Sequence, residues 1–157
     1  MEGIRSNLFI ALLYFLSVTA PSIHATDFKY CNKKKDYAVT ISGVEISPDP
    51  ITKGKETSFI ISAFTDKPLS GGKVVIGVAY FGWSVFSKTG DLCANISCPI
   101  PTGDFTISYS QLLPAIAPPG SYTLTLKVQD ANKSDLTCIK FDFSIGFFLS
   151  SERLTDT

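Results

Sequence analysis

The sequence has little of what enzymes and metal sites use most. Its single histidine, His24, falls in an N-terminal segment that we expect to be removed, so the remaining chain lacks the usual general base and the commonest metal ligand. It contains no serine-hydrolase G-x-S-x-G motif, no P-loop and no dinucleotide fingerprint. Glycosidase chemistry needs only two carboxylates, but acids such as Asp130 and Asp135 are scattered in predicted loops. We therefore expect a protein that is not an enzyme and that uses no metal or cofactor.

Excess charge of either sign is also absent. The formal net charge is zero at pH 7, and it stays zero without the N-terminal segment. Because nucleic-acid affinity depends on a basic face, we expect no nucleic-acid partner. Lys33 to Lys35 form a short basic run, which is typical of a solvated surface; contact with anionic headgroups is the alternative.

Only one long apolar run is present, and it lies at the N-terminus. Leu8 to Val18 is too short to span a bilayer and follows the basic Arg5. We expect residues 1–25 to be a signal peptide cleaved after Ala25, with Ala20 as the alternative site and a membrane anchor as the alternative function. Residues 26–157 would then form one domain in the secretory pathway. The chain shows no C-terminal retention signal, which favours the extracellular space (the apoplast in a plant) or the vacuole.

Four cysteines remain, and an even number in a secreted chain is typical of disulfides. Three pairings are possible. A local bridge between Cys93 and Cys98 is easy, and Cys31 and Cys138 would then join the two ends of the domain. The alternative is a zinc site, although such sites usually have tighter paired spacing and a histidine.

Two N-glycosylation sequons begin at Asn95 and Asn132. Both fall in predicted loops, where a glycan is sterically possible. We therefore expect a glycoprotein.

The strongest pattern runs from Ser121 to Gly146. Two segments alternate apolar and polar residues around the polar gap from Asp130 to Asp135, which predicts an antiparallel hairpin with one apolar face. That face carries eight large side chains: Tyr122, Leu124, Leu126, Val128, Ile139, Phe141, Phe143 and Ile145. A lone hairpin cannot bury them, so the rest of the chain must supply a facing layer.

Other segments predict further strands, and no segment shows a clear helical period. Strands are expected over 37–46, with a bulge at Gly43, over 57–65 and over 105–110. The apolar run 73–86 predicts either one strand buried on both faces or two strands bent at Gly82. About seven short strands separated by turns indicate an all-β, immunoglobulin-like sandwich.

Within the run 73–86, Tyr80, Phe81, Trp83 and Phe86 cluster beside a loop. Large side chains at the mouth of a sandwich can line an apolar pocket, and ordinary core packing is the alternative. Periodicity alone does not distinguish the two.

Three longer segments resemble a known family. They are YCNKKKDYAVTISGVEISPDPITKG (30–54), SGGKVVIGVAYFGWSVFSKTGDLCANISCPI (70–100) and LPAIAPPGSYTLTLKVQDANKSDLTCIKFDFSIG (113–146). Together they resemble the ML domain, the MD-2-related lipid-recognition family that includes Niemann-Pick type C2 sterol carriers. The similarity is greatest to plant members described as phosphatidylglycerol/phosphatidylinositol transfer-like proteins.

The resemblance implies a secreted sandwich whose sheets separate to hold a lipid. It also implies the pairs Cys31–Cys138 and Cys93–Cys98. Animal sterol carriers have a further cysteine pair near the proline turn, which is absent from 47–54 here. The resemblance thus implies lipid binding without specifying a sterol.

We expect the hairpin to form one wall of the cavity and the earlier strands the other, with a mouth near Trp83. The expected lipid-binding residues are Phe59, Ile61, Val78, Tyr80, Phe81, Trp83, Tyr122, Leu124, Leu126, Phe141, Phe143 and Ile145. The expected function is to bind or transfer a sterol or phospholipid as a monomer that contacts membranes transiently. The alternative is an accessory module for immunity or stress signalling, which presents a lipid or its own surface to a receptor or partner protein.

Overall fold

A computed structural model describes residues 25–146, which form eight strands and one short 3-10 helix. The elements are β1 (Phe28–Tyr30), β2 (Val39–Ser47), β3 (Glu56–Thr65), β4 (Lys73–Tyr80), β5 (Trp83–Asp91), η1 (Leu92–Ala94), β6 (Gly103–Leu112), β7 (Gly120–Gln129) and β8 (Asp135–Ile145). The predicted signal peptide lies outside the described residues, apart from Ala25.

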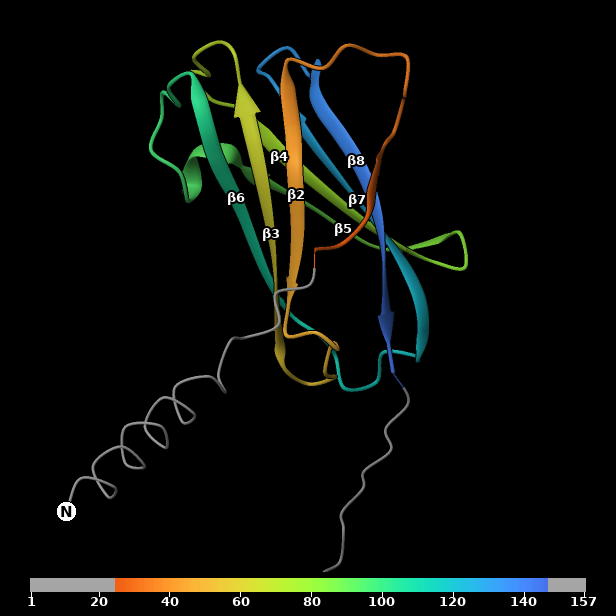
Figure 1. Cartoon of the computed structure of the whole chain (residues 1–157). Coiled ribbons are helices and arrows are strands. Elements are labelled where there is room, and N and C mark those ends of the chain that lie inside the picture. Colours follow the sequence, from red (N-terminus) through yellow and green to blue (C-terminus); the bar gives the residue numbers. More distant parts are fainter. Residues whose placement is uncertain (1–24, 147–157) are drawn as a thin grey trace, which may run out of the picture.

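The strands form two facing sheets (Figure 1). One has the order β1-β8-β7-β4-β5 and the other β2-β3-β6, and all strand pairings within them are antiparallel. This confirms the predicted all-β immunoglobulin-like sandwich. The register of β2 against β3 shifts between Ile41 and Gly43, which confirms the bulge.

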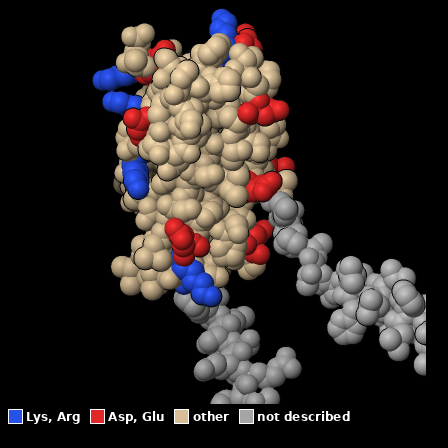
Figure 2. Space-filling view, turned by 90° about the vertical axis from the view of Figure 1, so that its left-hand side faces the viewer, with Lys and Arg blue, Asp and Glu red and all other residues tan. Residues whose placement is uncertain are grey.

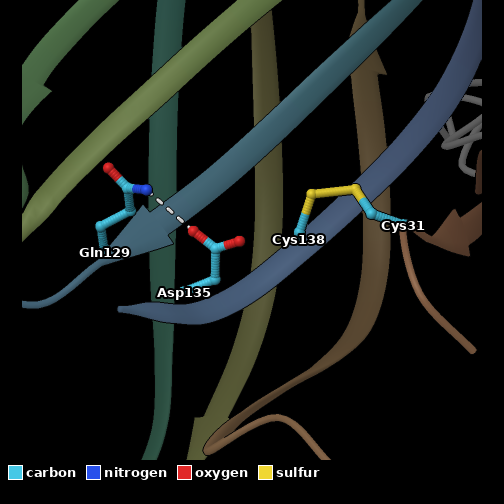
Figure 3. The surroundings of a disulfide bond; sticks show 4 residues. All are labelled: Cys31, Gln129, Asp135 and Cys138. Atoms are coloured by element: carbon cyan, nitrogen blue, oxygen red, sulfur yellow. Dashed lines mark hydrogen bonds between the residues drawn. A yellow bond between two sulfur atoms is a disulfide. The ribbon is translucent and has the colours of Figure 1, made fainter. Parts of the chain in front are cut away.

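The predicted hairpin corresponds to β7 and β8. The Asp130 carboxylate accepts hydrogen bonds from the backbone N–H groups of Asn132 (2.8 Å) and Ser134 (2.9 Å), which holds the loop in place. At the base of the loop, Gln129 Nε2 donates to Asp135 Oδ1 over 2.8 Å (Figure 3). Seven of the eight apolar side chains named for this hairpin are buried; Phe143 is half-buried.

One part of the strand pattern differs from expectation. No strand was predicted before residue 37, but β1 is present, and its Phe28, Lys29 and Tyr30 pair with β8. The run 73–86 forms two strands, which confirms the second of the two alternatives, two strands bent at Gly82. It turns sharply at Phe81 and Gly82, both with positive φ, and β5 continues through polar residues to Asp91. Two central residues with φ > 0 are the signature of a tight two-residue hairpin turn.

Two disulfides are present. Cys31, just after β1, bonds to Cys138 on β8 (Figure 3), and Cys93 bonds to Cys98 around the loop after η1. These are the pairs that the family resemblance implies. The first ties the edge strand β1 to its neighbour β8.

The hydrophobic core fills the sandwich unevenly. Its most buried members come from both sheets, including Val39, Ile61, Leu126, Val128 and Ile139. A second buried cluster, made of Ile51, Leu113, Tyr122 and Ile145, lies toward the β6–β7 connection. The site described next occupies the space beside this second cluster.

Candidate functional site

A cavity of about 380 Å³ opens between the two sheets. Its walls come from β3, β4, β5, β6, β7 and β8 and from the connection between β6 and β7. The lining residues are Phe59, Val78, Tyr80, Val85, Phe86, Tyr109, Gln111, Leu112, Leu113, Pro114, Ile116, Ala117, Pro118, Tyr122, Leu124, Phe143 and Ile145. Almost all of them are apolar or aromatic, so the cavity suits an apolar ligand.

Aromatic rings in contact with one another form part of the cavity wall. Tyr122 stacks on Phe143 with ring centroids 5.4 Å apart, and Tyr80 lies 4.7 Å from Tyr122. Phe59 approaches from the other sheet, 5.7 Å from Phe143. These contacts hold the rings in fixed positions, which favours a preformed cavity.

The tyrosine hydroxyls are bonded to the chain and not aimed at a ligand. Tyr80 donates to the Pro119 carbonyl over 3.0 Å, and Tyr122 donates to the Pro118 carbonyl over 2.6 Å. Gly120 is required beside them, because its φ is +135° and a Cβ there would lie 3.2 Å from the Tyr80 ring. The two tyrosines thereby hold the proline-rich connection over the cavity.

Burial raises the pKa of Tyr122, and the neighbouring Tyr80 raises it further. Burial also raises the pKa of Tyr109. Tyr109 O–H donates to Gln111 Oε1 over 2.9 Å, and Gln111 Nε2 donates to the Leu112 carbonyl over 3.2 Å. Both phenols stay protonated at neutral pH, so they add no charge to the cavity wall.

Seven of the residues predicted from sequence line this cavity: Phe59, Val78, Tyr80, Tyr122, Leu124, Phe143 and Ile145. Three others, Ile61, Leu126 and Phe141, are almost fully buried in the main core and are not among the lining residues. The last two, Phe81 and Trp83, lie at the tip of the β4–β5 hairpin with 75% and 79% of their surface exposed.

The predicted division into two walls is wrong for the β4 residues. Val78 and Tyr80 pair with Leu124 and Tyr122 in one sheet, so they extend the hairpin's own wall. The facing wall is formed by Phe59 of β3 together with Tyr109 and Gln111 of β6.

Sequence reasoning missed the contribution of the β6–β7 connection. No lining residue was predicted there, yet Leu113 and Ile116 reach the cavity from it. Two large apolar residues, Leu113 and Ile116, in a proline-rich loop are the signal that could have identified it. Phe86 was noted in the aromatic cluster, whereas Val85, Tyr109 and Gln111 were not proposed as lining residues.

Nothing in the described range offers a metal centre or a membrane span. Residues 25–146 contain no group of three His, Cys, Asp or Glu side chains placed to hold a metal ion. In the same range, no helix has the length and apolar character needed to cross a bilayer.

Figure 2 views the β6 side of the molecule, where acidic and basic side chains lie around a wide uncharged centre.

A profile of the ML domain matches residues 25–145. The chain belongs to the ML-domain family. The match covers every strand of the sandwich, and both disulfides are consistent with passage of an ML-domain protein through the secretory pathway.

Named relatives have lipid-related descriptions. A phosphatidylglycerol/phosphatidylinositol transfer protein of Aspergillus oryzae is 30% identical over 118 residues, which cover 71% of this chain and 67% of the relative. An MD-2-related lipid-recognition protein of Arabidopsis thaliana is 29% identical over 145 residues, covering 87% and 88% of the two chains. This ML-domain protein is thus related to lipid-transfer and lipid-recognition proteins.

Solved structures share the fold. A Niemann-Pick type C2 protein from the Japanese carpenter ant superposes with a TM-score of 0.62 at 15% identity, covering 76% of this chain and 98% of that one. Chicken MD-1 in complex with lipid IVa superposes with a TM-score of 0.52 at 15% identity, covering 82% and 100%. Both likenesses concern the arrangement of the ML-domain sandwich.

Proposed function

We propose that this protein is a non-enzymatic lipid carrier that holds a sterol or phospholipid between its two sheets. The observation that carries the proposal is the apolar cavity of about 380 Å³, bounded by Phe59 on one sheet and Tyr122 and Phe143 on the other. Its volume lies within the range of about 300–1,000 Å³ that is typical of small-ligand sites. Each Å² of apolar lipid surface removed from water would contribute about 25 cal/mol.

The relatives support this function. The Aspergillus oryzae relative is described as a phosphatidylglycerol/phosphatidylinositol transfer protein, and chicken MD-1 was crystallised with lipid IVa. Membrane lipid is therefore the ligand class to test first, with the polar headgroup near the surface and the apolar part inside.

Transfer requires contact with a membrane, and the β4–β5 hairpin offers a surface for it. Phe81 and Trp83 are exposed at its tip, while Val85 and Phe86 of the same hairpin line the cavity. Exposed aromatic residues beside a lipid cavity suit the water–membrane interface, where tryptophan is enriched. We propose that the protein touches membranes through this tip and otherwise circulates as a monomer.

The second candidate function is lipid recognition on behalf of a receptor or partner protein. The same exposed tip favours it, because contiguous exposed apolar side chains also mark protein contacts. Vesicle binding separates the two candidates: a carrier binds protein-free vesicles, whereas an accessory module needs its partner.

Secretion and glycosylation belong to the same proposal. Asn95 and Asn132 are exposed, in the disulfide loop and in the β7–β8 loop respectively, where an oligosaccharide could be attached. We propose that residues 1–25 direct the chain into the secretory pathway and that the mature protein acts outside the cell or in the vacuole.

A transfer assay tests the proposed function. Delipidated protein is mixed with donor vesicles that contain a fluorescent phospholipid or sterol and with unlabelled acceptor vesicles. The carrier should speed transfer in proportion to its concentration, without any change in the chemical structure of the lipid. Absence of transfer and of lipid binding, or conversion of the lipid to a product, would contradict the proposal.

A further inference from the structure

A second, smaller apolar cavity of about 240 Å³ lies along the same open side of the sandwich. Its wall includes the core residues Val74, Ile76, Leu92 and Ile107, and it extends to the Cys93–Cys98 loop at Asn95 and Ile96. Tyr109 lines both cavities. The two spaces therefore meet at one side chain, on the side where β5 and β6 are the unpaired edges of their sheets.

Lys88 lies at this boundary. In the β4–β5 register it pairs with Ile76, between the pairs Val78–Phe86 and Val74–Gly90. Because Ile76 is buried and lines the smaller cavity, Lys88 is on the inner face of β5. Phe86 lines the larger cavity and Gly90 the smaller one, so a lysine separates two apolar positions.

The ammonium group of Lys88 lies 5.5 Å from the centre of the Tyr109 ring. No carboxylate forms an ion pair with it among residues 25–146. The nearest acid in sequence, Asp91, also lines the smaller cavity, but its Oδ1 accepts a hydrogen bond from the Cys93 N–H over 2.8 Å. Lys88 is solvent-exposed, so its ammonium group loses little hydration free energy in the folded protein. The same exposure makes it accessible to an anion.

We propose that Lys88 binds the phosphate of a two-chain glycerophospholipid, whose acyl chains lie one in each cavity. This inference rests on the proposed lipid-carrier function and names the lipid class. Two apolar chains diverge from the glycerol beside a single anionic phosphate. The protein offers the matching arrangement: one cation on the open edge, with an apolar cavity on either side of it. Lysine pairs readily with phosphate as a point charge.

A charged residue that points inward on an edge strand has another known role, which is to prevent edge-to-edge aggregation. Edge protection requires a charged side chain of either sign, and it does not require a second cavity beside that side chain. Reversing the sign of the charge therefore distinguishes phosphate binding from edge protection.

The first experiment compares Lys88→Glu and Lys88→Arg with the wild type and with Lys140→Glu. Lys140 is an exposed lysine on the opposite face of β8 from the buried Ile139 and Phe141, so it controls for net charge. Dissociation constants are measured for dioleoyl phosphatidylglycerol and for cholesterol. Lys88→Glu should weaken phosphatidylglycerol binding at least tenfold and leave any cholesterol binding within twofold, whereas Lys88→Arg and Lys140→Glu should bind phosphatidylglycerol like the wild type.

The second experiment fills the smaller cavity. A Cβ added at Gly90 would meet no atom within 4 Å, so Gly90→Leu projects its side chain into that space. Gly77→Leu is the matched control, because Gly77 is equally uncrowded but lies on the outer face of β4, between inward-facing Ile76 and Val78. Gly90→Leu should weaken binding of the two-chain lipid at least tenfold and leave one-chain lysophosphatidylglycerol within threefold; Gly77→Leu should change neither.

The outcomes separate this inference from the function on which it rests. If the folded wild type binds no lipid, the carrier function and this inference both fail. If it binds lipid but Lys88→Glu retains full affinity for phosphatidylglycerol, or Gly90→Leu weakens both lipids equally, the carrier function stands and this assignment is overturned. For each variant, the affinities for the two lipids are measured on the same sample and compared as a ratio. A partly unfolded sample lowers both apparent affinities equally, so it does not change this ratio.

Discussion

At the scale of single residues, Leu126 and Val78 show what alternation does and does not predict. Both are aliphatic and face inward from the same sheet, where Leu126 pairs with Ile76 and Val78 with Leu124. Yet Leu126 is 1% exposed in the packed core, whereas Val78 lines the cavity. Period-two alternation indicates which face a residue takes, but it contains no information on how far apart the sheets lie at that point.

This difference predicts opposite results for two enlarging substitutions. Leu126→Trp should overpack the core and destabilise the fold by about 1–3 kcal/mol. Val78→Phe has the cavity to occupy, so it should change stability less and displace the lipid. Melting curves of delipidated protein, paired with a phospholipid titration, measure both effects. A large melting loss for Val78→Phe with unchanged affinity would mean that the cavity is closed at this position.

At the scale of elements, the β4–β5 hairpin positions the aromatic cluster differently from the sequence interpretation. The tight turn at Phe81 and Gly82 carries Phe81 and Trp83 outward, while Tyr80 turns in to line the cavity. The polar residues from Ser87 to Asp91 concealed how far β5 extends beyond the run 73–86, because an exposed edge strand needs no apolar alternation. The short β1 was missed for a different reason. Its pairing with β8 depends on contacts between residues distant in sequence, which a local pattern does not reveal.

The hairpin tip should report membrane contact directly, because Trp83 is the only tryptophan in the sequence. Adding phospholipid vesicles should shift its fluorescence emission to shorter wavelength as the indole leaves water. Phe81→Ser should weaken vesicle binding severalfold. The control is Phe64→Ser, which removes an exposed phenylalanine from β3. Emission that is unchanged at saturating vesicle concentrations would exclude this tip as the contact surface.

At the scale of the whole molecule, the sandwich is packed around Ile61, Leu126 and Val128 and hollow beside Tyr122 and Phe143. The fold class and the strong hairpin were predictable, because they follow from local alternation and turn residues. The position of the cavity was only partly predictable. It depends on how the two sheets diverge and on the β6–β7 connection, and both are set by contacts between residues distant in sequence.

The two disulfides should differ in their effect on global stability. Cys31 and Cys138 are 107 residues apart in sequence, and Cys93 and Cys98 are 5 apart. The loop-entropy relation assigns about 4.7 kcal/mol to a loop of about 100 residues and about 2 kcal/mol to the short one. Denaturant unfolding of Cys31→Ser/Cys138→Ser and Cys93→Ser/Cys98→Ser double variants compares them. Equal losses would show that the long loop is already restricted in the unfolded chain.

The most direct test of a lipid held between the sheets is to identify what the protein contains. Protein secreted from a eukaryotic host is purified without detergent, extracted with organic solvent and analysed by mass spectrometry beside the Val78→Phe variant. The account predicts close to one membrane lipid per wild-type molecule, unmodified in structure, and much less in the variant. A folded wild-type protein with both disulfides intact that yields no lipid, and takes none up from vesicles, would contradict it.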